Sequence, residues 1–480
     1  MTLLKTTDGG TAHFSSGVLE KFKRHFSGNL IGEKDQGYDD ARRIWNGLID
    51  KRPALIARCS GVKDVVEVVR FAREHDLLVA VRGGGHNVSG SAVCDGGLVI
   101  DLSAMHSTRV NLATHTVHAG GGATLADIDG QTQRFGLATT TGNVSKTGIA
   151  GLTLGGGFGN LRRKFGLGVD NLVSAEVVTA DGAVVRADSS TNADLFWALR
   201  GGGGNFGVVT SLELQLHPLG PEVMFAGQFF PLDDARAALR RWRDFVSDAP
   251  DEISSIAFFW TIPRTDPFPE ELRGKRVFLY GALYAGPAES GEKALAPLMK
   301  IGIPILDLSG RGPYMQWQQA FDPFFLPGAV YPELYAYWKS LYLNGLDDGL
   351  IDDLVGRAAN LPSEQCLIAI WQLGGALARV PETATAFGRR NAPFLLSYDS
   401  CWTDPSLSES VIGWTREQIA VAMPYSPGGS YLNFPGVGED NDILVRQAYG
   451  SNYERLAQIK RVYDPRNFFR LNQNIVPAIA

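Results

Sequence analysis

Arg82-Gly83-Gly84-Gly85-His86-Asn87 is the most informative stretch of this 480-residue sequence. It directly follows a short apolar run, Val79–Val81, which predicts a buried strand. Consecutive glycines let several backbone N–H groups converge on one anion, and Arg82 would add a positive charge there. A tight loop with no ligand is the alternative, but such a loop rarely needs three glycines followed by a histidine. The stretch therefore predicts an anion-binding loop at the end of a strand.

Glycine is abundant and is concentrated in the first half of the chain. The sequence has 56 glycines among 480 residues, about 12% against a usual ~7%. A helix opening at residues 60–64 precedes the strand at 78–81, and Asp181-Gly182 predicts a hairpin turn. The chain up to about Pro218 therefore predicts an α+β domain rich in glycine loops. Further glycine clusters beside apolar runs lie at residues 120–122, 155–157 and 201–204.

Composition and charge exclude several classes of protein. Lys and Arg total 45 against 51 Asp and Glu, a formal net charge of −6, so no basic surplus is available for a nucleic-acid backbone. The sequence has no run of about 18 apolar residues that would predict a membrane span. The four cysteines are far apart with no metal-type spacing, so we expect no metal site. With no signal-peptide pattern at the start, the protein is expected in a reducing cytoplasm.

The character of the sequence changes at about Gly220. Glycine becomes less frequent, aromatic residues gather, and helical stretches such as Asp234–Phe245 alternate with strand-like ones such as Val277–Tyr284. This pattern predicts a second domain with an aromatic-rich face. All eight histidines precede Pro218, so a general base contributed by the second domain must be Tyr, Asp, Glu or Lys. The tail Ile459–Pro477 is expected to return to the first domain.

A rival dinucleotide motif fails on its context. Gly202-x-Gly204-x-x-Gly207 matches the glycine fingerprint of nicotinamide-binding folds, which must follow a strand and open a helix. Here Leu195–Leu199 before it is helical in pattern, and Val208–Leu214 after it is strand-like. The order is reversed, and a nicotinamide-binding site is therefore rejected.

Four ordered motifs together resemble the berberine-bridge-enzyme-like branch of FAD-linked oxidases, within the vanillyl-alcohol-oxidase group of flavoproteins. The first is the stretch Arg82–Asn87. The others are Thr147–Gly159 (TGIAGLTLGGGFG), Phe196–Gly207 (FWALRGGGGNFG) and Tyr463–Ile475 (YDPRNFFRLNQNI). The resemblance runs from about Pro53 to Pro477. It implies FAD as cofactor and leaves the substrate open, because the family is chemically diverse.

The resemblance implies an α+β protein of two domains. One is a PCMH-type FAD-binding domain, and the other is a substrate domain in which helices cover an antiparallel sheet. The FAD-binding domain is expected to comprise residues 1–218 and 450–480, with the PCMH-type core at about 49–218. Residues 219–449 are expected to form the substrate-binding domain.

His86 matches the family histidine that bonds covalently to the 8α-methyl group of the flavin, and a neutral imidazole is a suitable nucleophile. Many members add a second bond through a cysteine, but Val144 occupies that position here. Cys59 and Cys94 are the nearest cysteines and lie outside the motif, so we expect one covalent bond. The resemblance assigns these residues to FAD binding: Arg82, Gly83, Gly84, Gly85, His86, Asn87, Ser89, Gly142, Val144, Thr147, Gly148, Gly151, Gly155, Gly156, Val209, Asn472 and Asn474.

The resemblance leaves two candidates for the catalytic base. Plant members often carry a tyrosine where this chain has Phe158, and a Gln or Glu where it has Ser397. What remains is Tyr431, which with Asn433 matches the family's Tyr-x-Asn-Tyr motif, and Asp399 as the second candidate. A phenol is a weak base near pH 7 unless a cation stabilises its anion, and otherwise it is an apolar wall with a satisfied hydroxyl. The candidate cations are Arg389, Arg390 and Lys146.

The implied activity is that of an FAD-dependent oxidase. A hydride would pass from a carbon next to an alcohol or amine of a small substrate to flavin N5, and O2 would reoxidise the flavin and yield H2O2. Thr147, about the size of valine, matches the position where a small residue admits oxygen, which favours an oxidase. The alternatives are a flavin dehydrogenase with another electron acceptor and a non-catalytic flavin- or ligand-binding protein. The aromatic face suggests an aromatic, alkaloid, terpenoid or sugar substrate.

Overall fold

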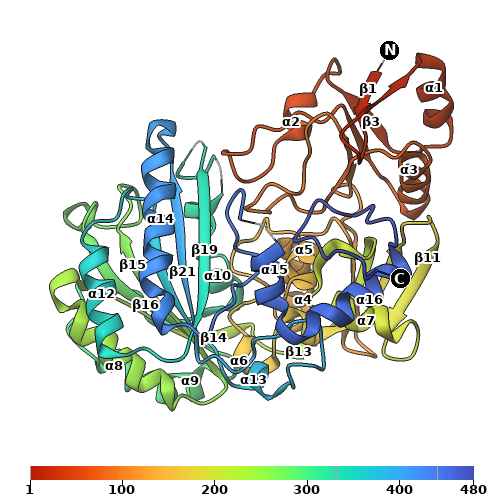
Figure 1. The fold of residues 1–480 in the computed structure, drawn as a ribbon. Helices are drawn as coiled ribbons and strands as arrows, with labels where there is room; N and C mark the ends of the chain where they lie inside the picture. The colour runs from red at the N-terminus through yellow and green to blue at the C-terminus, as the bar shows by residue number, and fades with distance from the viewer. Residues whose placement is uncertain (1, 327, 332, 440–441, 480) are drawn as a thin grey trace.

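The computed structural model describes residues 2–326, 328–331, 333–439 and 442–479 and shows an α+β protein. Three larger sheets form its frame, and two small pairs, β1 with β2 and β9 with β13, are added to them. Figure 1 shows the N-terminal elements in red at the upper right, and the strands of the second half in green and blue on the left. The small pairs comprise β1 (Thr2–Lys5), β2 (Thr11–Phe14), β9 (Leu137–Ala138) and β13 (His217–Pro218).

The N-terminal sheet has the order β3–β4–β6–β5, and β4, β6 and β5 run parallel. Helix α3 (Val62–Glu74) connects β4 to β5 and buries its valine stripe against the sheet, which confirms the predicted helix–strand unit. Because β5 ends at Arg82, the glycine stretch begins where the strand ends. The strands are β3 (Asn29–Gly32), β4 (Leu55–Arg58), β5 (Val79–Arg82) and β6 (Leu98–Asp101).

The second sheet is antiparallel, with the order β11–β10–β12–β8–β7. Asp181-Gly182 turns β10 into β11, as predicted, and Gly182 has a φ of +77° that favours glycine. Helix α7 (Ala193–Leu199) precedes the glycine cluster and β12 follows it, which confirms that the order is the reverse of a nicotinamide site. The strands are β7 (Thr108–Asn111), β8 (Thr116–Gly120), β10 (Leu172–Val178), β11 (Val184–Asp188) and β12 (Val208–Gln215).

The third and largest sheet lies in the second half of the chain, and the described residues give it eight antiparallel strands in the order β17–β14–β16–β15–β20–β21–β19, with β18 beside β14. Alternate residues of β15 and β20 enter two different hydrophobic clusters, so both faces of this sheet are buried. The strands are β14 (Glu222–Pro231), β15 (Ile253–Thr261), β16 (Arg276–Tyr284), β17 (Leu306–Asp307), β18 (Gly310–Pro313), β19 (Tyr335–Leu343), β20 (Leu367–Gln372) and β21 (Phe394–Trp402).

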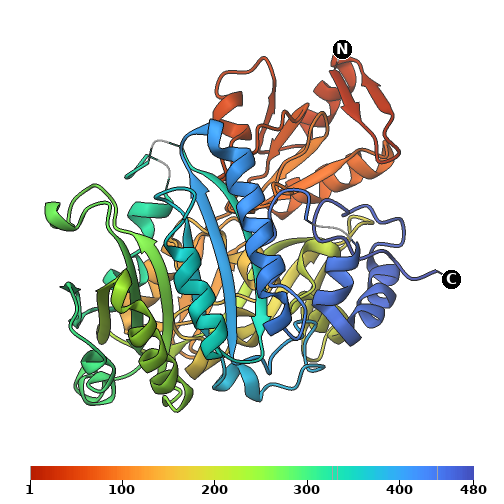
Figure 2. The ribbon, with the colours of Figure 1, turned by 60° about the vertical axis from the view of Figure 1, so that its left-hand side comes forward.

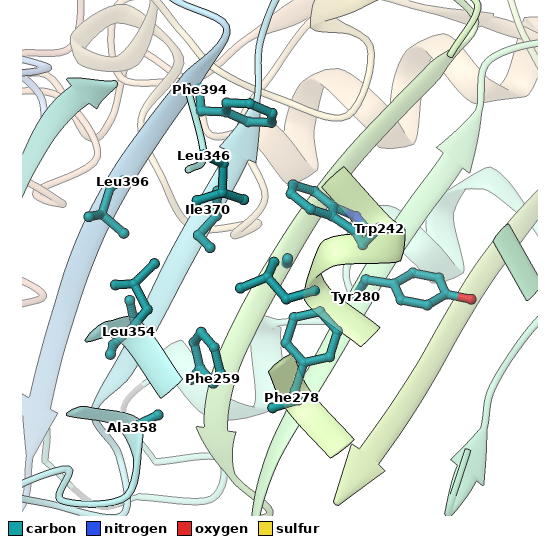
Figure 3. Close-up of a cluster of buried hydrophobic side chains, with 14 of the residues drawn as sticks. Trp242, Phe259, Phe278, Tyr280, Leu346, Leu354, Ala358, Ile370, Phe394 and Leu396 are labelled. Atoms are coloured by element: carbon teal, nitrogen blue, oxygen red, sulfur yellow. The ribbon is translucent and has the colours of Figure 1, made fainter. Parts of the chain in front are cut away.

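Four helices cover one face of the large sheet, which we call the helix face: α8 (Ala235–Ser247), α9 (Ala288–Leu295), α12 (Asp348–Ala358) and α14 (Ser408–Ala422). Figures 1 and 2 show these helices along one side of the long strands. Trp242 of α8 and Leu354 of α12 pack there with Phe259 and Ile370 of the sheet (Figure 3). The other face, which we call the site face, points toward the N-terminal half of the chain, because its cluster includes Phe158.

The C-terminal segment packs against the N-terminal half. Helices α15 (Asp442–Tyr449) and α16 (Tyr453–Tyr463) lie near α7 (Figure 1), and both contribute to the same core cluster as α7 and β12. Ile475 N–H donates to Asn205 Oδ1 at 2.9 Å. Residues 442–449, which the sequence assigns to the substrate domain, therefore share the core of the N-terminal half.

No helix in the described part of the chain is long and apolar enough to cross a membrane. Within the same residues, no group of three or more His, Cys, Asp or Glu side chains is arranged to hold a metal ion. The remaining α-helices are α1 (Ser16–Arg24), α2 (Tyr38–Arg42), α4 (Leu125–Thr132), α5 (Ile149–Leu154), α6 (Arg162–Phe165), α10 (Tyr314–Gln318), α11 (Asp322–Phe325) and α13 (Ala376–Arg379).

Candidate active site

A cavity of about 290 Å³ lies between the glycine loops of the N-terminal half and the site face of the large sheet. The loop after β5, the segment Gly142–Gly155 and the cluster after α7 form the glycine-rich side. Strands β15, β19, β20 and β21 contribute side chains to the other side. Residues 431–434, 469 and 471–473 complete the lining, so segments from residue 79 to residue 473 meet here.

The glycines allow a close approach of backbone segments and leave open space for a ligand. A Cβ atom on Gly84 would lie 2.4 Å from the backbone nitrogen of Gly148, and one on Gly155 would lie 2.1 Å from Asn433 Oδ1. Gly151 and Gly204 also line the cavity, but a Cβ atom on either would have no protein atom within 4 Å. A side chain at these two positions would instead fill the cavity.

Arg82 does not line the cavity. From the sequence we expected its positive charge to contribute to anion binding at this loop, and the structure does not place it there. Its Nη2 lies 2.6 Å from Asp101 Oδ2, on the neighbouring parallel strand, and its Nη1 donates to the Ala41 carbonyl. Burial opposes ionisation of Asp101, but the Arg82 guanidinium and further donors hold its pKa below the usual value. The positive charge is therefore compensated inside the protein, and Arg82 anchors the base of the loop.

His86 lies in the cavity wall and is held by stacking. Its ring lies 4.3 Å from the Trp45 ring, with an angle of 15° between the planes. Its Nε2 is buried and has no hydrogen-bond partner in the described structure. Burial lowers the pKa of His86 to about 4, so the imidazole is neutral at pH 7. A neutral imidazole with an unpartnered nitrogen is the state that a nucleophilic role requires.

Most of the other residues assigned to FAD binding lie in the cavity lining, but Ser89, Gly156 and Asn474 lie outside it. Ser89 Oγ donates to Asn87 Oδ1 at 3.0 Å and so supports a lining residue. Gly156 has a φ of +129°, and a Cβ there would meet the Phe387 ring at 2.9 Å. Residues of the list that line the cavity are Gly83, Gly84, Gly85, His86, Asn87, Gly142, Val144, Thr147, Gly148, Gly151, Gly155, Val209 and Asn472.

The sequence pattern missed several polar lining residues. Asn143 and Gln473 directly adjoin residues that were assigned, and both line the cavity. Their neighbours in the motifs were the only available signal. Five cavity-lining side chains carry a buried polar atom without a partner among the described residues: His86 (Nε2), Asn143 (Oδ1), Asp399 (Oδ1), Asn472 (Oδ1) and Gln473 (Nε2). Because each unpaired buried polar atom costs about 1–3 kcal/mol, this cluster favours a polar ligand in the cavity.

Tyr431 is fully buried, and its hydroxyl oxygen accepts two hydrogen bonds. Gly157 N–H donates to Tyr431 Oη at 3.0 Å, and Asn433 Nδ2 donates to it at 2.7 Å. The Phe158 ring lies 4.4 Å from the Tyr431 ring. Burial raises the pKa of Tyr431 to about 12, although these donors oppose the shift. The phenol is therefore neutral at pH 7.

The three cations expected to stabilise a Tyr431 phenolate are not available to it. Arg390 Nη2 lies 2.8 Å from Asp170 Oδ1 in a buried ion pair. Arg389 Nη2 donates to the Gln447 carbonyl at 3.3 Å, and Lys146 is exposed. The hypothesis of a cation-stabilised phenolate is therefore not supported by the geometry.

Asp399 lies on the site face of β21 and lines the cavity. In the strand register it lies opposite Leu367 of β20 and Trp338 of β19. Burial raises the pKa of Asp399 to about 7, and a hydrogen bond with Ser397 partly opposes this rise. The Ser397 hydroxyl oxygen in turn accepts a hydrogen bond from Trp371 Nε1 at 3.1 Å. The cavity thus contains a carboxyl group whose pKa is close to neutral pH.

Comparisons with known proteins agree with this geometry. Residues 53–188 match the FAD binding domain family, and residues 430–476 match the family described as berberine and berberine like. The chain is similar to an uncharacterized FAD-linked oxidoreductase of Bacillus subtilis, with 31% identity covering 96% of this chain and 98% of the relative. It is also 31% identical to (R)-6-hydroxynicotine oxidase of Paenarthrobacter nicotinovorans, over 94% of this chain and 97% of the relative.

Solved structures show the same fold. 6-Hydroxy-D-nicotine oxidase from Arthrobacter nicotinovorans superposes with a TM-score of 0.83 at 29% identity, covering 94% of this chain and 98% of that chain. Chitooligosaccharide oxidase has a TM-score of 0.82 at 24% identity, with coverage of 97% and 100%. Fold and site together define an FAD-linked oxidoreductase. The chain belongs to the berberine-bridge-enzyme-like family of these proteins.

The residues of the cavity fit FAD. The open space beside Gly151 and Gly204 gives a planar or phosphate-bearing group direct access to the backbone. Asn143, Asn472 and Gln473 have unpaired amide atoms that a polar cofactor satisfies. These observations concern this chain alone and agree with the family assignment.

Proposed function

We propose that this protein is an FAD-dependent oxidase that holds its cofactor through a covalent bond to His86 and uses Asp399 as the catalytic base. The proposed substrate is a small molecule with a C–H bond next to an alcohol or amine. When bound, FAD supplies the hydride acceptor and the route of the electrons to O2. The products are then the carbonyl compound or imine and H2O2, so that two electrons and two protons are balanced.

The observation that carries this proposal is the unpaired Oδ1 of Asp399 in the cavity wall. Proton transfer is most efficient when the pKa of the base lies near the working pH, and burial raises the pKa of Asp399 to about 7. Burial raises the pKa of Tyr431, which the sequence placed first, to about 12, and no cation among the described residues lowers it. We therefore assign proton abstraction from the substrate hydroxyl or amine to Asp399.

Tyr431 and Asn433 have a positioning role in this proposal. The Tyr431 oxygen already accepts two hydrogen bonds, so its own O–H is free to donate to a bound molecule. Asn433 Nδ2 also donates to the Leu152 carbonyl at 3.1 Å, and its Oδ1 fills the space beside Gly155. Asn433 thereby fixes the phenol relative to the glycine turn.

The state of the nearest cysteine thiols supports a single covalent bond between the flavin and the protein. Cys59 and Cys94 are buried, unpaired and absent from the cavity lining, and burial raises the pKa of the Cys94 thiol to about 12. Neither residue supplies a thiolate, and Val144 occupies the lining position that matches the family cysteine. All four cysteines are unpaired, which supports the prediction of a reducing cytoplasm.

Thr147 lines the cavity and supports the choice of oxidase over dehydrogenase through its small side chain. The relative named (R)-6-hydroxynicotine oxidase supports the same choice. The test is anaerobic mixing of the holoenzyme with a panel of alcohols and amines, followed by admission of air. We expect loss of the flavin absorbance, then rapid recovery with one H2O2 per flavin. Slow recovery would identify a dehydrogenase, and no loss with any compound would favour a non-catalytic binding protein.

A further inference from the structure

The part of the cavity wall supplied by the large sheet and by helix α11 with its N-cap residue Phe321 is almost entirely apolar. Asp399 is the one polar side chain that the described residues between 219 and 429 contribute to the lining. The other contributors from this region are Phe258, Phe321, Phe325, Trp338, Leu367 and Trp371. We call these seven residues the substrate wall.

The two tryptophans of the substrate wall use their indole N–H groups inside the protein. Trp338 Nε1 donates to Cys401 Sγ at 3.4 Å, and Trp371 Nε1 donates to Ser397 Oγ at 3.1 Å. Both acceptors belong to β21, and neither lines the cavity. The indoles therefore present hydrocarbon and π surface to a ligand, and no free donor.

This distribution of polar atoms discriminates between substrate classes. A saccharide carries several hydroxyl groups on each ring, and each hydroxyl buried without a partner costs about 1–3 kcal/mol. On the substrate wall only the Asp399 carboxyl is free to accept a hydrogen bond from one of them. A flat molecule with one donor, in contrast, satisfies that carboxyl and covers the rings, which favour stacked or edge-to-face contacts.

Resting on the function proposed above, we propose that the substrate is a largely apolar, aromatic molecule with a single hydroxyl or amino donor beside the reacting carbon. Asp399 receives that donor, and the rings of Phe258, Trp338 and Trp371 hold the aromatic body. Saccharides should bind more weakly, since the substrate wall offers partners to few of their remaining hydroxyl groups. Of the four substrate classes that the sequence leaves open, this proposal favours the aromatic ones and disfavours sugars.

The test is equilibrium binding to the holoenzyme under anaerobic conditions, followed by flavin difference spectra and tryptophan fluorescence. The ligands are cinnamyl alcohol, benzylamine, cyclohexylmethanol, D-glucose and cellobiose. We expect the better of the two aromatic compounds to bind at least about tenfold more tightly than either sugar, which corresponds to one or more unpaired hydroxyl groups. Comparison of cinnamyl alcohol with benzylamine shows whether the site prefers a hydroxyl or an amino donor. Comparison of both with cyclohexylmethanol shows whether an aromatic ring binds better than a saturated one.

Binding does not require turnover, so the dissociation constants can still be compared if no compound reduces the flavin. In that case the proposed oxidase fails while the substrate class is still decided. Equal or tighter binding of glucose or cellobiose would overturn the inference, as would the absence of aromatic binding up to the solubility limit.

Two neighbouring phenylalanines supply a matched pair of variants. Phe258 lines the cavity, whereas Phe259 points to the helix face and packs in the core of Figure 3. Phe258→Leu should weaken binding of the aromatic ligand roughly fivefold, as expected for the loss of one ring contact. Phe259→Leu should lower the melting temperature and leave the Kd unchanged. The same Kd for wild type and Phe258→Leu would show that this ring does not contact the ligand and would contradict the assignment of the wall.

Discussion

Replacement of Asp399 by asparagine is the sharpest test of the proposed chemistry. The amide has nearly the same shape and can keep the contact with Ser397, but it takes no proton from the substrate. General-base catalysis contributes about 10²- to 10⁴-fold to a rate, so we expect Asp399→Asn to reduce the anaerobic rate of flavin reduction by that factor. The assay is stopped-flow absorbance of the flavin after mixing with a compound that reduces the wild-type enzyme.

The pH dependence of the flavin reduction rate tests the same role of Asp399 independently. Because the pKa of Asp399 is raised to about 7, the carboxylate that accepts the proton disappears below neutral pH. The wild-type reduction rate should therefore fall about tenfold per pH unit at pH values below about 6 and level off above about 8. We call this fall of the rate at low pH the acidic limb, and the rate of Asp399→Asn should not show it.

The raised pKa also predicts a change in stability. Between the ordinary aspartate pKa of 3.8 and about 7, the unfolded chain loses this proton while the folded protein keeps it. The folded state binds more protons in this window, so its stability falls as pH rises through it. The loss amounts to at most on the order of 4 kcal/mol, since each pKa unit is worth about 1.4 kcal/mol. Asp399→Asn should therefore raise the melting temperature of the apoprotein at pH 8.

Asp129 provides the matched control. Burial also raises its pKa to about 7, and its Oδ1 is likewise unpaired, but it lies on α4 and does not line the cavity. Asp129→Asn should therefore stabilise the apoprotein at pH 8 and leave the acidic limb of flavin reduction intact. Two results would refute the assignment of Asp399 as the base. One is an acidic limb in Asp399→Asn like that of the wild type, and the other is a rate of flavin reduction lowered less than about threefold.

Three further outcomes follow from the site. His86→Ala should release the yellow colour into the supernatant on acid precipitation, whereas the wild type should keep it in the pellet; free flavin from both would show that no covalent bond forms. Ser397→Ala removes a hydrogen bond that lowers the pKa of Asp399, so the acidic limb should move to higher pH by up to about one unit, and an unmoved limb would exclude this contact. Gly151→Ala adds a methyl group to the open cavity and should lower flavin content, measured as the A450/A280 ratio. Gly130→Ala, on the exposed side of α4 with equal space, should keep the flavin and add up to about 1 kcal/mol to the free energy of unfolding.

Local patterns in the sequence were sufficient for much of the fold. The apolar run before Arg82, the helix at residues 62–74 and the Asp181-Gly182 turn depend on interactions between near neighbours, and all are present in the structure. The reversed order around the Gly202–Gly207 motif is also a local property. These features required no knowledge of how distant segments meet.

The electrostatic assignments failed where the partner is distant in the sequence. Arg82 is neutralised by Asp101 on the adjacent strand, 19 positions later. Arg390 is neutralised by Asp170, which lies 220 positions earlier. A count of charges near a motif cannot reveal such pairs, because burial makes each guanidinium depend on the carboxylate that the fold brings to it.

The importance of Asp399 could have been found from strand periodicity. Ser397 and Asp399 are two positions apart in β21, so their side chains share one face. From the sequence, Asp399 is only the second candidate after Tyr431, because the Gln or Glu of other members aligns with Ser397 and not with Asp399. The structure shows that a carboxyl group lies on the same face two residues later, in register with Trp338.

The contrast between the two faces of the large sheet argues that this carboxyl group is functional. On the helix face, most residues of β20 and β21 are apolar and pack into a continuous core, and the two polar ones, Gln372 and Ser400, are hydrogen-bonded to α8 and α14. The site face is equally buried, but it retains Asp399, whose Oδ1 has no partner in the described part of the chain. An apolar residue in its place would avoid the cost of a buried, unpaired group. A bound substrate donor removes that cost, and the same contact places a base at the atom that must lose its proton.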